Sequence, residues 1–250
     1  MKILGFLLAI LFFSCANDTK KPLKVKEINN PKDSVPLFSK DTPEIKGIDT
    51  SKYKLLTDVQ SINNNIRVDL KYATTDNFIK LKCYERLNHA YLQKDVAIRL
   101  GKCQEYLTFI DPSLHLLVYD AVRPLSVQKK MWEALDSIPI KERVKFVANP
   151  AGKSLHNYGA AVDVTICDND DNPLDMGAGF DDMRQISFPS LETTFLSKGL
   201  LTKEHIANRT LLRKIMHAQG FTGIPTEWWH FNACSRAIAA TKYKLLDEEP

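Results

Sequence analysis

Two short segments that lie far apart in the chain contain the residue types of a metal-dependent hydrolase. Residues 154–163 (SLHNYGAAVD) include His156 and Asp163, and residues 227–230 (EWWH) end in His230. Two imidazoles and one carboxylate are ligands that zinc accepts in catalytic sites, where three protein ligands leave a fourth position for water. His156, Asp163 and His230 are therefore candidate ligands of one zinc ion.

A one-zinc hydrolase also needs a proton acceptor. Zinc lowers the pKa of a bound water to roughly 7, and a carboxylate that does not bind the metal must then take up the proton. The same carboxylate can later pass the proton to the leaving amine. Glu227, three residues before His230, fits this role.

The spacing of the first motif makes a demand on the backbone. Positions 156 and 163 would lie on opposite faces of an unbroken strand, so the chain must turn or bulge between them. Residues 157–159 (NYG) supply turn-forming types, and residues 160–166 are small and β-branched, which is typical of a buried strand. Asp163 is therefore expected to project from a rigid element.

Each candidate taken singly has a structural alternative. A lone histidine is more often a hydrogen-bonded structural residue than a ligand, and Asp163 alone is compatible with a strand-end cap. The paired motifs favour a metal site, because Gly, Trp or Ser residues beside each candidate indicate crowding around it. The other histidines lack such settings and are interpreted as structural: His89, His115, His205 and His217.

The pattern Ser-x-His-x-x-Gly-x-Ala-x-Asp followed by Glu-x-x-His resembles that of the zinc D,D-peptidases, which include D-alanyl-D-alanine carboxypeptidases and VanX-type D-alanyl-D-alanine dipeptidases. The resemblance extends over residues 53–232, and the doubled tryptophan is its most specific mark. Four further segments favour the dipeptidase branch, namely 71–78 (KYATTDNF), 119–124 (YDAVRP), 176–181 (MGAGFD) and 213–216 (RKIM), the last leading through Gly220 and Phe221 to the EWWH motif.

This resemblance implies roles for individual residues. His156, Asp163 and His230 would bind one zinc ion per chain, Glu227 would be the general base, and Arg123 would stabilise the oxyanion. A guanidinium aimed at an oxygen that gains negative charge is a preorganised stabiliser. The alternative for Arg123 is a surface salt bridge beside a helix start, because the proline that follows it readily occupies a first helical turn.

The resemblance also implies a substrate site. Asp181 matches the position that receives the free ammonium of the substrate, with Tyr72 and the Ser154 region nearby. A dipeptidase needs such an anion to detect a charged end and reject longer peptides. The alternative for Asp181 is a solvated turn, because residues 168–182 form an acidic stretch.

The amino terminus predicts export. Lys2 and the apolar run 3–13 precede Ser14-Cys15, after which the composition becomes polar. The run is shorter than the roughly 20 residues that span a bilayer, so residues 1–15 are interpreted as a lipoprotein-type signal peptide with Cys15 lipidated. Phe12 stands where leucine is usual, and a plain cleaved signal or an uncleaved anchor are the alternatives. The expected location is the bacterial cell envelope, on a membrane facing the periplasm.

The rest of the chain divides into a tether and one domain. Residues 16–50 are rich in lysine and proline and poor in large apolar residues, which predicts a disordered tether. Residues 51–250 are expected to form a single catalytic domain. Strands interspersed with helices predict an α+β fold, and the resemblance implies a small, mainly antiparallel sheet flanked by helices, with the zinc site on the sheet. We expect helices at 93–109, 126–135, 203–219 and 234–245, and strands at 66–72, 115–119, 161–166 and, bulged, 228–232.

Cysteines and charge limit the other classes of function. Besides Cys15 there are Cys83, Cys103, Cys167 and Cys234, an even number that leaves disulfides open in an oxidising compartment, while the lack of a CxxC motif argues against thiolate zinc. The net charge is +4, without a basic helix carrying interleaved aromatics, so no nucleic acid partner is expected. The expected partners are a dipeptide substrate and, through Cys15, a membrane; no obligate protein partner is inferred.

Three functions are compatible with these sequence features. The first is zinc-dependent hydrolysis of D-alanyl-D-alanine in the envelope; the second is a D,D-carboxypeptidase or other murein peptidase acting on peptidoglycan stems. The doubled tryptophan, Asp181 and segment 71–78 favour the first. The third, an inactive zinc-binding envelope protein, is disfavoured because Glu227 and Arg123 are both present. An exported enzyme lacks access to the cytoplasmic dipeptide pool, so salvage or wall turnover is the hypothesised role.

Overall fold

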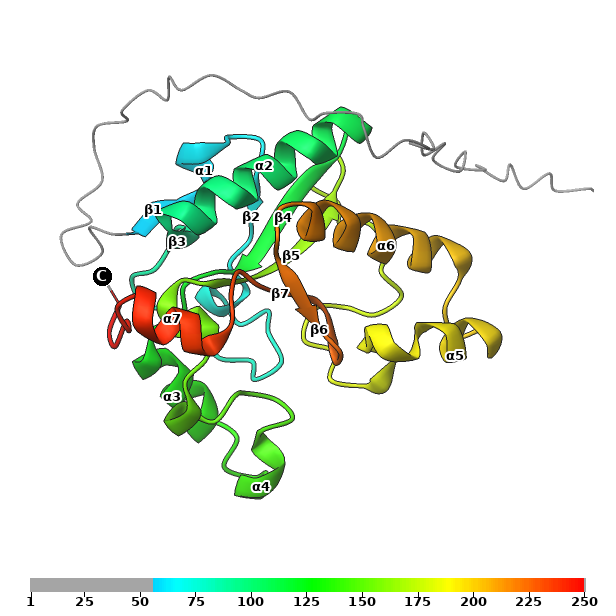
Figure 1. Cartoon of the computed structure of the whole chain (residues 1–250). Coiled ribbons are helices and arrows are strands. Elements are labelled where there is room, and N and C mark those ends of the chain that lie inside the picture. Colours follow the sequence, from blue (N-terminus) through cyan, green and yellow to red (C-terminus); the bar gives the residue numbers. More distant parts are fainter. Residues whose placement is uncertain (1–55, 250) are drawn as a thin grey trace, which may run out of the picture.

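A five-stranded sheet lies at the centre of the computed structural model, which describes residues 56–249 (Figure 1). The strand order is β2-β4-β5-β7-β6, and β1 and β3 form a separate two-stranded sheet. The predicted signal peptide, Cys15 and the tether fall on residues outside the described range. The strands are β1 (Leu56–Asp58), β2 (Arg67–Val68), β3 (Tyr91–Gln93), β4 (His115–Asp120), β5 (Ala161–Cys167), β6 (Thr222–Ile224) and β7 (Glu227–Asn232).

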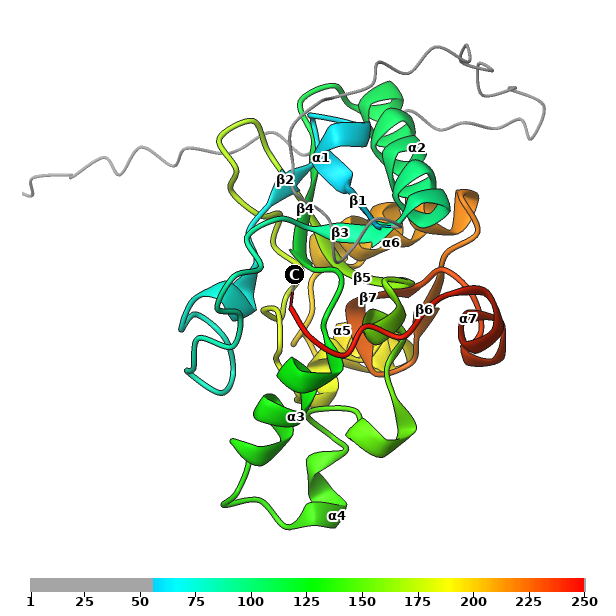
Figure 2. The ribbon, with the colours of Figure 1, turned by 90° about the vertical axis from the view of Figure 1, so that its left-hand side faces the viewer.

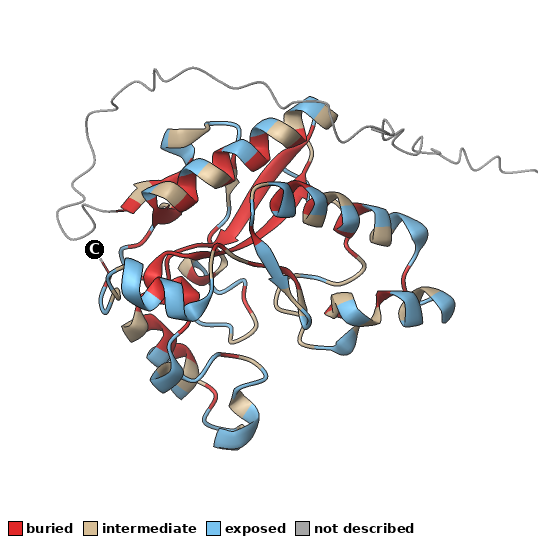
Figure 3. Ribbon diagram, viewed as in Figure 1, coloured by how far each residue is buried: buried red, intermediate tan, exposed pale blue. Residues whose placement is uncertain are grey.

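The two central strands form the buried spine of the fold. Every residue of β4 and β5 is buried, as expected for apolar strands covered on both faces (Figure 3). Only β2 and β4 run parallel, and the other pairs in both sheets are antiparallel. Asp120 on β4 pairs with Asp163 on β5, which in turn pairs with His230 on β7. These three polar residues therefore form a row across the middle of the sheet.

Helices surround the sheet, which confirms the predicted α+β class with a small, mainly antiparallel sheet. The two longest, α2 (Lys94–Ile110) and α6 (Lys203–Ala218), pack against each other (Figures 1 and 2). Thr202 caps α6, and Gly220, with φ of 73°, follows its end. The other helices are α1 (Val59–Ile62), α3 (Leu125–Glu133), α4 (Ile140–Arg143), α5 (Glu192–Ser197) and α7 (Arg236–Lys242), with 3₁₀ turns η1 (Lys71–Ala73), η2 (Pro150–Gly152), η3 (Leu155–Tyr158), η4 (Gln185–Ser187) and η5 (Pro189–Leu191).

Two of the expected elements differ from the structure. The strand expected over 66–72 is wrong beyond residue 68, because the chain turns into η1 and the carbonyl of Tyr72 accepts hydrogen bonds from the backbone of Cys83 and Tyr84. The helix expected over 234–245 is shorter, because Ser235 caps it and it ends at Lys242. The other helices and strands are confirmed within one or two residues.

The bulge expected in the last strand is also present. Pairing between β6 and β7 shifts between Gly223, which faces Phe231, and Ile224, which faces Glu227. Cys83, Cys103, Cys167 and Cys234 are all free, so there is no disulfide among these cysteines of the described chain. Within residues 56–249, no helix combines the length and the apolar character needed to cross a membrane.

Candidate metal centre and active site

The 3₁₀ turn η3 places His156 just ahead of the strand that carries Asp163. The hydroxyl of Ser154 accepts a hydrogen bond from the backbone N–H of His156, and the side chain of Asn157 accepts one from the backbone of Ser154. Gly159, with a left-handed φ of 62°, ends the turn and directs the chain into β5. The turn expected at residues 157–159 is therefore confirmed.

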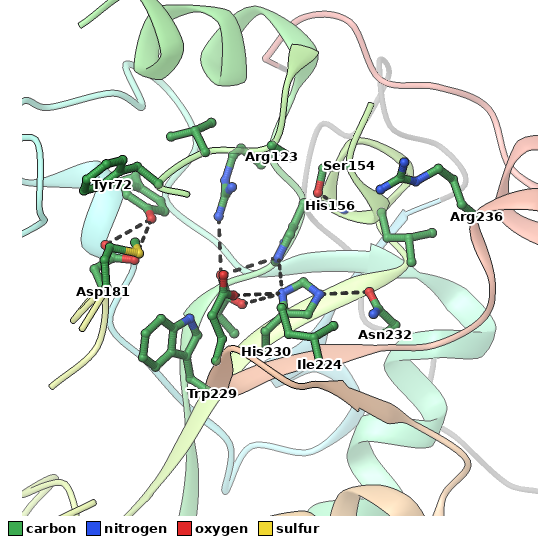
Figure 4. A pocket seen from close by; sticks show the side chains of 17 residues that line it. Tyr72, Arg123, Ser154, His156, Asp181, Ile224, Trp229, His230, Asn232 and Arg236 are labelled. Atoms are coloured by element: carbon green, nitrogen blue, oxygen red, sulfur yellow. Dashed lines mark hydrogen bonds and ion pairs between the residues drawn. The ribbon is translucent and has the colours of Figure 1, made fainter. Parts of the chain in front are cut away.

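The three candidate metal ligands meet in space. Their ligand atoms all lie within 4.8 Å of one another. Nδ1 of His230 is 2.9 Å from Oδ1 of Asp163, and Nε2 of His156 is 3.4 Å from Oδ2 of the same carboxylate (Figure 4). The two imidazole nitrogens are 3.2 Å apart. Three elements, η3, β5 and β7, thus contribute one candidate ligand each.

The ring nitrogens of His156 and His230 that point away from Asp163, here called the outer nitrogens, indicate that the three candidate ligands suit a cation. Nδ1 of His156 is 2.6 Å from the carbonyl oxygen of Ala121, and Nε2 of His230 is 2.9 Å from Oδ1 of Asn232. These acceptors favour N–H on the outer nitrogens, so the inner nitrogens direct lone pairs toward each other and toward Asp163. A metal ion among them removes that repulsion, and such outer hydrogen bonds are usual for metal-bound histidines. The donor set fits zinc.

Charge in the group reinforces this conclusion. Burial disfavours the charged form of His230, but the hydrogen bond and charge of Asp163 outweigh it and raise the pKa of His230 to about 9. Although burial also opposes ionisation of Asp163, His156 and His230 hold the pKa of its carboxyl well below the ordinary range. Without a metal ion, a proton therefore supplies the positive charge that the site favours.

Glu227 lies beside the ligand group without belonging to it. Its Oε2 is 3.9 Å from Nδ1 of His230, and its side chain is 28% exposed. Burial and the charge of Asp163 raise the pKa of Glu227, with the positive charge of His230 acting in the opposite direction. The carboxylate is therefore placed to exchange protons next to the metal ligands, as a general base requires.

Arg123 is buried and held by the carboxylate of Asp120, for which the sequence predicted no role. Its Nε and Nη2 lie 2.8 and 2.6 Å from Oδ2 of Asp120, and Nη2 is 3.3 Å from Oδ2 of Asp163. The hydroxyl of Tyr84 donates to Asp120 at 2.5 Å. The alternative of a surface salt bridge is therefore wrong for Arg123. An acidic residue that ends an otherwise apolar strand, three positions before Arg123, was the available signal.

Asp181 lies at one end of the site. Tyr72 donates its hydroxyl to this carboxylate, at 3.1 Å from Oδ1 and 3.0 Å from Oδ2. Burial, followed by repulsion from Asp163, raises the pKa of Asp181 to about 8. The neighbouring Phe180 packs edge-on against Trp229 at 5.5 Å. The backbone of Asp181 is left-handed, with φ of 59°.

Helix α6 fixes the loop that carries Asp181. Arg209, only 1% exposed, donates from Nε to the carbonyl of Met176 at 2.7 Å and from Nη2 to the carbonyl of Ile186 at 3.1 Å. One guanidinium thereby holds the chain on both sides of Asp181. This anchoring, together with the aromatic contact of Phe180, distinguishes Asp181 from a solvated acidic turn.

A cavity of about 210 Å³ joins these groups. Figure 4 shows Asp181 and Tyr72 at one side and Ser154 on the opposite side of His156, so Ser154 does not adjoin Asp181 as expected. Asn232 and Arg236 also line the cavity and were not foreseen. All eight residues expected at the site line it: Tyr72, Arg123, Ser154, His156, Asp163, Asp181, Glu227 and His230.

The histidines interpreted as structural lie outside this cavity. His89 is hydrogen-bonded to Asp58, and His205 to Asp175. His115 bonds the backbone of Asn65 and the side chain of Asn169.

The fold and the site define a zinc metallopeptidase. The chain belongs to the D-ala-D-ala dipeptidase family, whose model matches residues 52–246. It is 33% identical to a D-alanyl-D-alanine dipeptidase of Escherichia coli, over 78% of this chain and 90% of the relative. It is 31% identical to a D-alanyl-D-alanine dipeptidase of Synechocystis, over 60% of this chain and 71% of the relative. It is 32% identical to a D-alanyl-D-alanine dipeptidase of Enterococcus faecalis, over 74% of this chain and 88% of the relative.

A solved structure of a mutant of the vancomycin-resistance D,D-pentapeptidase VanY in complex with Zn(II) is also similar in part. The two chains are 14% identical, and the match covers 63% of this chain and 81% of the VanY chain, with a TM-score of 0.32. The predictions of family, enzyme class and zinc cofactor are confirmed by the family match together with the His–Asp–His group. The roles of individual residues are predictions that the experiments below address.

Proposed function

We propose that this chain hydrolyses free D-alanyl-D-alanine to two molecules of D-alanine. The observation that carries the proposal is Asp181, a carboxylate at the end of a small cavity with no ion-pair partner among the described residues. The cavity, at about 210 Å³, is smaller than the roughly 300–1,000 Å³ of pockets for drug-sized ligands. A short substrate with a free ammonium suits both features.

The ammonium would complete the hydrogen bonding of Asp181. This carboxylate accepts a hydrogen bond from the hydroxyl of Tyr72, and an ionised carboxylate can accept several more. An ammonium brings three N–H donors and the opposite charge, and its arrival favours the ionised form of Asp181 against the burial that raises its pKa. A peptide with a blocked amine offers neither advantage.

The reaction follows from the neighbouring side chains. His156, Asp163 and His230 would hold a zinc ion, which would supply a Lewis acid to acidify water and polarise the scissile carbonyl. Glu227 takes up a proton from the attacking water and delivers it to the leaving amine; its raised pKa suits it to both transfers. Arg123, oriented by Asp120, stabilises the oxygen that becomes negative as the carbonyl is attacked.

The proposed setting is the bacterial cell envelope, with the enzyme attached through lipid on Cys15. Support comes from the sequence pattern of residues 1–15. In that setting the dipeptide would come from wall turnover, and its cleavage would return D-alanine to the cell.

A panel of four peptides tests the proposed activity. The purified, zinc-loaded chain is assayed with D-Ala-D-Ala, its N-acetylated form, L-Ala-L-Ala and a stem pentapeptide ending in D-Ala-D-Ala. We expect the free D,D-dipeptide to have the highest kcat/KM and the acetylated form to be a very poor substrate. Equal or faster cleavage of the pentapeptide would reject the dipeptidase assignment in favour of a carboxypeptidase.

A further inference from the structure

The side of the cavity away from Asp181 carries a second charged group. Figure 4 shows the guanidinium of Arg236 directed toward Ser154, while Asp181 and Tyr72 lie on the other side of His156 and His230. We propose that Arg236 binds the terminal carboxylate of the peptide substrate. The proposal rests on the proposed peptidase function and adds a second recognition point to it.

The fold holds Arg236 next to the turn that bears His156. Arg236 is the first residue of α7, and Ser235 caps this helix by accepting the backbone N–H of Ile238. Ala239, on the next turn of α7, packs in a small apolar cluster with Leu155 and Tyr158 of η3. Because α7 packs against η3, Arg236 and Ser154 face the same part of the cavity.

The guanidinium of Arg236 has donors to spare. It has no hydrogen-bond or ion-pair partner among residues 56–249, whereas Arg123, the other arginine in the cavity wall, is occupied by Asp120 and Asp163. A guanidinium presents five N–H donors in a planar fork that matches a carboxylate in a bidentate arrangement. The hydroxyl of Ser154 accepts a hydrogen bond from the backbone N–H of His156 and can donate its own O–H to the same substrate carboxylate.

The order of charges along the cavity matches a dipeptide zwitterion. An anion, Asp181, stands at one side, His156 and His230 lie in the middle, and a cation, Arg236, stands at the other (Figure 4). Glu227 lies beside His230, with 3.9 Å between its Oε2 and Nδ1 of the imidazole. A peptide bound with its ammonium at Asp181 and its carboxylate at Arg236 would place its single amide bond beside the metal ligands. Recognition of both charged ends selects a peptide by its length as well as by its charge.

The test compares a free acid with its amide. Kinetic constants are measured for D-Ala-D-Ala and for D-Ala-D-alaninamide, with wild-type protein and with Arg236→Met, which keeps an unbranched apolar stem. Lys244→Met is the matched control, because this lysine is exposed, follows the same helix and does not line the cavity. Zinc content and the melting temperature of each variant are recorded.

We expect Arg236→Met to lower kcat/KM for the free acid by about 10- to 100-fold, mainly through KM, the scale of one lost charge-assisted interaction. The kcat/KM for the amide should change little, so the preference for the free acid over the amide should be lost. Arg236→Lys should keep part of this preference. Lys244→Met should match the wild type. Equal losses on acid and amide, or no loss on either, would overturn the proposal.

A failure of the dipeptidase assignment can be distinguished from a failure of the proposed role of Arg236. The acid and amide comparison can be made with whichever peptide of the panel the wild-type protein cleaves, including the pentapeptide. If none is cleaved, calorimetric titration of the zinc-loaded protein with D-Ala-D-Ala replaces the kinetics. Wild-type protein should then bind the dipeptide more tightly than Arg236→Met does, and equal affinities would reject the role of Arg236.

Discussion

Asp120 and Asp163 are paired residues on the adjacent strands β4 and β5, and Nη2 of Arg123 lies 2.6 Å from the first carboxylate and 3.3 Å from the second. Both carboxylates are buried, so their repulsion would be costly without a cation. Arg123 supplies that cation. Its fixed position is therefore a property of the sheet, since the strand register sets the separation of the two carboxylates.

Replacing Arg123 by alanine should lower kcat far more than it raises KM. Loss of one oxyanion-stabilising donor typically lowers kcat about 10²- to 10³-fold. Steady-state kinetics on the free dipeptide provide the measurement. An effect confined to KM would instead make Arg123 a ligand for the substrate carboxylate, and Asp120→Asn, which keeps the guanidinium but loosens it, should show a smaller loss of kcat.

Replacing Glu227 by glutamine should leave zinc in place and remove most of the activity. The amide has nearly the same size but cannot take up a proton, and general acid–base catalysis typically contributes about 10²- to 10⁴-fold. Metal analysis and kcat are measured on the same sample. If the variant loses zinc as readily as His230→Ala, Glu227 is a ligand rather than the base.

The purified protein should contain one zinc ion per chain, and His156→Ala, Asp163→Ala or His230→Ala should each abolish stoichiometric binding. A site with three protein ligands loses much of its affinity when one is removed. His205→Ala serves as the control, because this histidine pairs with Asp175 outside the cavity. Full activity after exhaustive chelation would be incompatible with the assignment.

Zinc binding should strengthen as the pH rises toward 9. Without metal, Asp163 raises the pKa of His230 to about 9, against the opposing effect of burial, so below that pH the ion must displace a proton from this imidazole. Displacement of one proton corresponds to about a tenfold gain in apparent affinity per pH unit. Competition with a chelator between pH 6 and 8 measures the slope. A pH-independent affinity would show that His230 is already neutral.

Asp181→Asn should impair cleavage of the free dipeptide and spare zinc binding. Asparagine retains the size of the side chain and a carbonyl acceptor for Tyr72, but it loses the charge that would pair with the ammonium. We expect kcat/KM for D-Ala-D-Ala to fall by about 10- to 100-fold. The residual activity on the N-acetylated form should change little, and a parallel loss on both substrates would point to a structural role.

The residues that come together in the candidate site could be predicted from the sequence because their types are diagnostic and closely spaced. His156 and Asp163 fall within one motif, and Glu227 and His230 within another. What brings the two motifs together is the register of β5 against β7, a long-range property that no local pattern fixes. The row from Asp120 through Asp163 to His230 could therefore only be seen in the fold.

Other differences also depend on contacts between segments that are separate in the sequence. The apolar residues of 66–72 indicated a longer strand, but its second half turns into η1. The carbonyl of Tyr72 accepts hydrogen bonds from the backbone of Cys83 and Tyr84, and its hydroxyl donates one to Asp181. Arg236 gave no signal, because exposed arginines at helix starts are common, and Arg236 is itself exposed although it lines the cavity. Its place in the cavity depends on the packing of α7 against η3.

The left-handed backbone at Asp181 limits what evolution can place there. Aspartate and asparagine adopt this conformation more readily than other residues with a side chain, so glutamate is a poor replacement although it carries the same charge. A single nucleotide change from aspartate to asparagine removes the charge while respecting the backbone. If Asp181 pairs with the substrate ammonium as proposed, this one mutational step would remove the preference for a free amine and leave His156, Asp163 and His230 unchanged.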